Sequence, residues 1–142
     1  MVLGFMRSFP NGEPTNFKEK ILSGEKIHSI RQGDRWQEGY FLHMAYGVRT
    51  NTYQQFNQGV KALEKVISTQ DVFMTLLNGK LEITVDDCYL TQLGIQSLIK
   101  NDGVTRKQFV DWFFPKKAEV FSGQIIHWTP LKYTHNSPHP PL

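Results

Sequence analysis

A lysine, a serine and an arginine stand close together in the segment 24–31, which reads Gly-Glu-Lys-Ile-His-Ser-Ile-Arg. An amine is a nucleophile only when it is deprotonated, so Lys26 needs a pKa lowered by desolvation or by a neighbouring cation such as Arg31. Strict alternation along a strand puts Ser29 and Arg31 on one face and Lys26 on the other. The three side chains therefore converge only if Lys26 lies in a turn or bulge before the strand.

Lys26 also has a purely structural explanation. The residues before it predict a short helix over 16–23, in which Asn16 caps the start together with Glu19, and Gly24 ends the helix. A lysine just past a helix C-terminus is favoured there by the helix dipole, whatever the protein does. Position alone therefore leaves both a catalytic and a structural role open for this lysine.

The pattern Gly24, Lys26, Ser29, Arg31 behind a helix resembles the Gly-x-Lys-x-x-Thr/Ser-x-Arg motif of the ASCH domain family, loosely over residues 15–133. The resemblance implies a small barrel related to the PUA RNA-binding fold, with a cleft for a nucleobase, a nucleoside or RNA. Small bacterial members include amidohydrolases that remove an acyl group from the exocyclic amine of cytidine. There the motif lysine, the Thr/Ser and a glutamate on a late helix form the catalytic set, which implies catalytic roles for Lys26 and Ser29.

The sequence departs from that family at the glutamate, whose position falls on Gln108. A glutamine cannot titrate and so cannot move a proton in amide hydrolysis. Asp111 lies three residues on and substitutes for the glutamate only if the helix is rotated or shifted. Thr105 and Gln108 also match a helix capping box, which gives Gln108 a sufficient structural role.

Ligand-binding residues are predicted around the same cleft. Arg31, Arg35 and Arg49 together form a clamp for phosphate or carboxylate if they meet in space. Tyr46 and Tyr53 flank a loop rich in hydroxyls, which suits stacking on a base. The alternatives are separate surface arginines and an ordinary surface loop.

The remaining pattern predicts an α+β protein, a small mixed β-barrel with flanking helices, and the resemblance implies that this barrel is PUA-like. Asn78-Gly79 is a strong hairpin signal between two apolar runs. We expect one ASCH-like domain over residues 1–133 and an extended or disordered Pro-rich tail over residues 134–142. The expected strands cover 27–31, 40–46 and 121–129, with two or three more within 60–86 that include 72–77 and 80–85. The later expected helices cover 90–100 and 105–114.

Composition narrows the function classes without choosing one. The chain has 142 residues, a net charge of +3 and one cysteine, Cys88, and it contains no apolar run of the ~20 residues that a membrane span needs. We therefore expect a cytoplasmic protein with no membrane contact, and its five histidines lack the spacing of a metal site, so no metal or cofactor is expected. The predicted function is binding of RNA or a modified nucleoside in a basic cleft. The alternatives are an amidohydrolase acting on N4-acylcytidine-type nucleosides and an interaction module without a small ligand.

Overall fold

The computed structural model describes residues 1–134, so the predicted tail, apart from Thr134, lies outside the described residues. Its strands and helices alternate irregularly along the chain. In order they are β1 (Val2–Phe5), α1 (Phe17–Leu22), β2 (His28–Gln32), β3 (His43–Tyr46), β4 (Gln54–Gln55), the 3₁₀ turn η1 (Lys61–Leu63), β5 (Ser68–Leu77), β6 (Lys80–Val85), β7 (Cys88–Tyr89), α2 (Gln92–Asn101), α3 (Arg106–Phe113), the 3₁₀ turn η2 (Pro115–Lys117) and β8 (Val120–His127).

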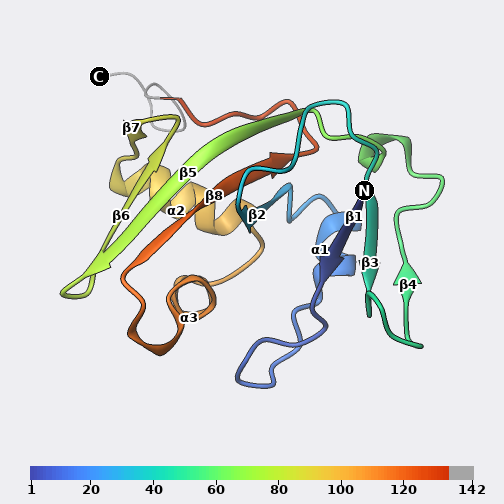
Figure 1. Ribbon diagram of the computed structural model, residues 1–142, viewed down its shortest axis with the longest axis horizontal. Coiled ribbons are helices and arrows are strands. Elements are labelled where there is room, and N and C mark those ends of the chain that lie inside the picture. The colour runs from blue at the N-terminus through green and yellow to red at the C-terminus, as the bar shows by residue number, and fades with distance from the viewer. Residues whose placement is uncertain (135–142) are drawn as a thin grey trace.

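The larger sheet has five strands in the order β2-β8-β5-β6-β7, and every pairing in it is antiparallel. The last strand, β8, lies between β2 and β5 (Figure 1). The hairpin of β5 and β6 turns at Asn78-Gly79, where both residues have positive φ (53° and 76°), as a primed turn requires. The hairpin predicted from this dipeptide is confirmed.

The smaller sheet has three strands in the order β1-β3-β4, with β1 and β3 parallel. It lies with α1 on one side of the molecule, apart from the five-stranded sheet and α2 (Figure 1). The strand β1 was not predicted. It lies within the first ten residues, where Leu3 and Phe5 point inward.

Two hydrophobic clusters make up the core. One fills the space between the five-stranded sheet and α2 and α3, and the other lies among α1, the three-stranded sheet and the residues Ile126 and Trp128. Val104 and Trp112 pack against both clusters. The α2–α3 connection therefore lies where the two halves of the core meet, and this junction is the setting of the site described below.

The α+β class is confirmed, since the described part of the chain forms three α-helices beside the two sheets. Within residues 1–134 the strands stay in two separate sheets and do not close into a single barrel by strand pairing. The expected cap of α1 is wrong: Asn16 has a left-handed backbone (φ 55°), and its side chain makes no capping hydrogen bond. Along residues 60–67 the chain forms η1 rather than a strand.

Candidate functional site

A small cavity of about 50 Å³ lies at the junction of the two hydrophobic clusters. Most of its wall is apolar, with aromatic rings from both clusters, among them Phe5, Phe17 and Phe109. Four polar residues also line it: Lys26, Ser29, Arg31 and Asp102. A volume of this size holds a few water molecules or a group as small as an acyl group.

Lys26 reaches this cavity because it precedes β2 instead of belonging to it. Its backbone N–H donates to the carbonyl of Lys20 at the end of α1 (2.9 Å), and the N–H of Ile27 donates to the carbonyl of Asn101 at the end of α2 (2.9 Å). Strand alternation begins only at His28. Lys26, Ser29 and Arg31 therefore line one cavity, which is the convergence that a turn before the strand permits.

Gly103 allows the close approach of Lys26 to the end of α2. This glycine has φ +79°, and a Cβ placed on it would lie 3.0 Å from the Cβ of Lys26. A side chain at this position meets both a backbone conformation that glycine favours and the stem of the lysine. The turn after α2 is thus shaped to pack directly against Lys26.

The amine of Lys26 is fully enclosed and bound to Asp102. Its Nζ donates to the backbone carbonyl of Asp102 (2.7 Å) and to Oδ1 of the same residue (3.0 Å). The Phe17 ring lies beside the amine, 4.7 Å from Nζ to the ring centroid. Lys26 is only 1% exposed and Asp102 5% exposed, so the ion pair is shielded from solvent.

Burial lowers the pKa of Lys26 below its ordinary value, although Asp102 opposes the shift, while Arg31 and Lys20 add to it by charge repulsion. Burial by itself would raise the pKa of Asp102, but the charge of Lys26 and the hydrogen bond to His28 hold it below its usual value. The carboxylate is therefore ionised at neutral pH, and the lysine gives up its proton more readily than a lysine in water.

Ser29 and Arg31 lie beside this pair on β2. The Nε of Arg31 donates to Oγ of Ser29 (3.1 Å), so the serine oxygen accepts a hydrogen bond from a cation and keeps its own proton to donate. The guanidinium also lies over the Phe5 ring, with its Cζ 5.0 Å from the centroid. Burial lowers the pKa of Arg31 to about 10, which leaves the group charged at neutral pH.

A larger depression adjoins the cavity and shares part of its wall. It has a volume of about 510 Å³, which is within the range of small-molecule sites. Gly4, Phe5, Met6 and Arg31 line both spaces, and Arg7, Gly47, Val48, Thr50 and Thr52 complete the larger one. Arg31 thus stands between a small enclosed cavity and an open depression of nucleoside size.

Gln108 and Asp111 do not line the cavity. Gln108 completes the capping box of α3, in which its Oε1 accepts from the N–H of Thr105 (2.9 Å) and its own N–H donates to Oγ1 of Thr105 (3.2 Å). Asp111 is exposed and pairs with Lys107 one helical turn away (2.8 Å). The contacts of Gln108 are those of a helix cap. Neither Gln108 nor Asp111 lines the cavity that holds Lys26 and Ser29.

The predicted clamp of three arginines does not come together on this cavity, where Arg31 is the one that takes part. Arg35 is exposed and lies over the Trp36 ring (5.9 Å), close enough to Arg31 to lower its pKa. Arg49 is exposed on the loop after β3. Of the two tyrosines, Tyr46 is buried, and its hydroxyl accepts from the N–H of Lys18 (2.8 Å), whereas Tyr53 is 46% exposed.

Asp102 is the site residue that the sequence analysis missed, because it lies between the helices expected over 90–100 and 105–114, where a polar residue fits an ordinary helix end. A signal was present in the sequence. A carboxylate at a helix C-terminus meets the negative end of the helix dipole, and this is unfavourable unless a cation lies nearby. The structure supplies that cation as Lys26, which lies 76 positions earlier in the chain.

No known protein resembles this chain closely enough to assign it a family. Searches of protein-family models, of curated proteins and of solved structures found no match to this chain. Within residues 1–134, no helix is long and apolar enough to cross a membrane. The same residues contain no group of three or more His, Cys, Asp or Glu side chains placed to hold a metal ion. The resemblance to the ASCH family stays a prediction carried by the segment 24–31.

Proposed function

We propose that this protein is an amidohydrolase that removes an acyl group from the exocyclic amine of a nucleoside of the N4-acylcytidine type. The observation that carries the proposal is the enclosed Lys26–Asp102 pair, which lines the same cavity as the hydroxyl of Ser29. The substrate class comes from the resemblance of residues 24–31 to the ASCH motif. The carboxylate that was expected on α3 is supplied by Asp102 at the end of α2.

The two adjoining spaces suit the two parts of such a substrate. The acyl group fits the enclosed cavity of about 50 Å³, and the nucleoside fits the depression of about 510 Å³ beside it. Arg31 lines both, so the amide bond between the two parts would lie next to its guanidinium and the oxygen of Ser29. With this placement we expect the scissile carbonyl to lie within reach of Oγ of Ser29.

In the proposed reaction Oγ of Ser29 attacks the acyl carbonyl while its proton passes to Lys26 in its deprotonated form, which the lowered pKa of this amine makes easier to reach. The C–N bond then breaks, and the Lys26 ammonium returns that proton to the leaving amine. Water attacks the acyl-Ser29 ester with Lys26 again as base, which releases the carboxylic acid and regenerates the serine. Arg31 stabilises negative charge that develops on oxygen, and Asp102 holds the lysine through its two hydrogen bonds.

Binding of a nucleoside or RNA without hydrolysis is a second candidate, favoured by one observation. The larger depression is lined by Arg7, Arg31, Thr50 and Thr52, which offer cationic and hydroxyl groups to a phosphate or a base edge. Both candidates place the ligand in the same depression and fit the expected cytoplasmic location. They differ only in whether the Lys26–Asp102 pair acts on the ligand.

The deciding experiment is release of acid and nucleoside from N4-acetylcytidine, followed by chromatography. We expect the wild type to turn over, and Lys26→Ala, Ser29→Ala and Asp102→Asn each to lose at least about 10²-fold in kcat/KM, as for removal of a general acid or base. Matched controls at exposed positions are Lys107→Ala, Ser122→Ala and Asp34→Asn, which should keep wild-type rates.

A wild type that shows no turnover contradicts the hydrolase. Calorimetry with the same nucleoside and with a short RNA then separates the remaining classes. Binding weakened by Arg31→Ala and by Thr52→Ala supports a binding protein. Absence of both turnover and binding supports the interaction module.

A further inference from the structure

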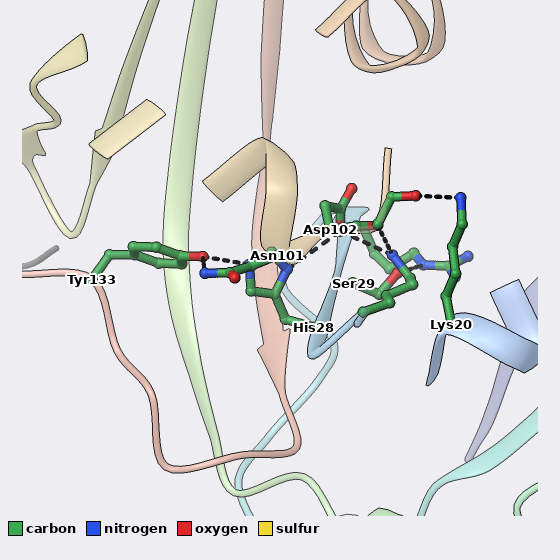
Figure 2. A network of polar contacts seen from close by, with 9 residues as sticks. Lys20, His28, Ser29, Asn101, Asp102 and Tyr133 are labelled. Carbon is green, nitrogen blue, oxygen red and sulfur yellow. Dashed lines mark hydrogen bonds and ion pairs between the residues drawn. The ribbon is translucent and has the colours of Figure 1, made fainter. Parts of the chain in front are cut away.

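A chain of buried polar side chains continues from Asp102 away from the cavity. His28, on β2, lies with its Nδ1 3.3 Å from Oδ1 of Asp102 and its Nε2 2.6 Å from the hydroxyl of Tyr133. Asn101 Nδ2 donates to the same hydroxyl (3.0 Å). Figure 2 shows Tyr133, Asn101 and His28 on one side of Asp102 and Lys20 on the other. None of these contacts is used by the proposed reaction.

The directions of these hydrogen bonds follow from the donors present. The oxygen of Tyr133 accepts from Asn101, so the hydroxyl proton of Tyr133 points to His28 Nε2. A neutral imidazole that accepts at Nε2 carries its proton at Nδ1 and donates it to Asp102 Oδ1. The reverse arrangement would aim the lone pair of Nδ1 at an ionised carboxylate. Oδ1 of Asp102 therefore accepts from both His28 and Lys26.

The tyrosine at the far end is itself fixed in place. Gln70 on β5 donates from Nε2 to the carbonyl of Tyr133 (2.7 Å), and its Oε1 accepts from the N–H of Tyr133 (2.8 Å). Tyr133 is 1% exposed and His28 has no exposed surface. The segment that follows β8 is thus clamped to the sheet at the residue that orients His28.

We infer that His28 is a positioning residue for the Lys26–Asp102 pair, which it holds by donating from Nδ1 to the carboxylate, and that Tyr133 fixes His28 from the segment after β8. By sharing the charge of Asp102, His28 weakens the hold of the carboxylate on the proton of Lys26. Catalysis by this arrangement rests on the proposed function, but the arrangement itself is a property of the buried chain of contacts.

Several charged or titratable groups surround this pair and bear on its response to pH. Three charged groups lie close enough to Lys26 to shift its pKa. They are Lys20 on α1, Arg31 on β2 and Asp102 at the end of α2. His28 faces Asp102, Tyr133 and the ring of His127, whose centroid is 5.5 Å away. Burial lowers the pKa of His28, so its ring is neutral at pH 7 and donates at Nδ1 without carrying a charge.

The test compares His28→Asn with His28→Gln. An Asn amide occupies the place of Nδ1 and keeps a donor for Asp102, whereas a Gln amide occupies the place of Nε2 and reaches only toward Tyr133. We expect His28→Gln to lower kcat for N4-acetylcytidine by about 10- to 100-fold with little change in KM. The acidic limb of kcat/KM should move up by about one pH unit, because Asp102 then holds the lysine proton more tightly. His28→Asn should recover most of the wild-type kcat and of the wild-type pH profile. Tyr133→Phe should give values between those of His28→Gln and His28→Asn.

A second readout keeps the inference separate from the proposed reaction. NMR titration of the Lys26 side chain, assigned with Lys26→Ala, should give a higher pKa in His28→Gln than in the wild type and in His28→Asn. If the wild type releases no acid but this pattern is seen, the proposed function fails and the positioning role stands. If both variants leave the Lys26 titration at its wild-type position, the positioning role is overturned, whatever the activity.

Discussion

Residues 1–134 contain two lysine–aspartate pairs of nearly equal length in very different surroundings. Lys26 and Asp102 are 3.0 Å apart, with side chains 2% and 7% exposed, whereas Lys107 and Asp111 are 2.8 Å apart, with side chains 82% and 48% exposed. The two aspartates are nine positions apart along the α2–α3 segment. Distance alone therefore does not separate the pair at the candidate site from the pair on the surface.

The difference lies in what surrounds each charge. The hydrogen bond to Asp111 raises the pKa of Lys107, so that the exposed pair holds its proton more firmly than a free lysine does. Burial lowers the pKa of Lys26 in spite of Asp102, so that the enclosed pair loses its proton more readily. Enclosure thus moves the pKa of the lysine in the direction opposite to the shift that an aspartate partner causes at the surface.

The largest expected effect comes from breaking the enclosed pair. Lys26→Met or Asp102→Asn alone leaves one buried polar or charged group without its partner, and each should lower the free energy of unfolding by about 3–5 kcal/mol. The double variant should lose much less than the sum, because no unpaired charge remains. Urea unfolding of the four proteins measures this coupling. Additive losses would show that the two side chains do not depend on each other.

Burial also makes His127 a source of sensitivity to acid. Burial lowers the pKa of His127 to about 3, with added repulsion from His28 and Lys132. The unfolded chain binds a proton at this residue below about pH 6.5 and the folded protein does not, so stability falls as the pH drops from 6.5 to about 3. The expected contribution is about 1.4 kcal/mol per pH unit.

His127→Gln keeps an amide N–H for the Nε2 contact with Gln70 but removes the titrating group. Its free energy of unfolding should fall less steeply than that of the wild type between pH 6 and pH 4. His43, which is exposed, offers the matched control, and His43→Gln should follow the wild-type slope. Equal slopes for His127→Gln and the wild type would rule out His127 as a source of acid sensitivity.

The features that could be predicted from the sequence are those with local causes. The turn at Asn78-Gly79 and the capping box of Thr105 and Gln108 each depend on residues within four positions of one another, and both are present. The expected cap at Asn16 is local too, yet the backbone there is left-handed and the side chain makes no capping hydrogen bond. Local signals thus predict elements well and their exact ends less well.

Only the part of the candidate site that lies in the segment 24–31 could be predicted from the sequence. Lys26, Ser29 and Arg31 lie within six residues of one another, and the resemblance to the ASCH motif groups them on the condition that Lys26 lies in a turn before the strand. Asp102 joins them because the chain at residue 27 bonds to the end of α2, a contact between segments about 75 residues apart that no local pattern encodes. Counting along the chain instead favoured Gln108 and Asp111, which belong to the cap and the exposed face of α3.

The smallest expected effect is at the exposed pair of Lys107 and Asp111. A double-mutant cycle with Lys107→Ala and Asp111→Ala should give a coupling too small to distinguish from zero, because water and salt screen both charges and ordering two long side chains opposes the attraction. Urea unfolding at low and at high salt measures it beside the cycle for Lys26 and Asp102. The enclosed pair should keep its coupling in salt, since ions do not reach it. A coupling at the exposed pair as large and as salt-resistant as that of the enclosed pair would show that enclosure is not what sets the two apart.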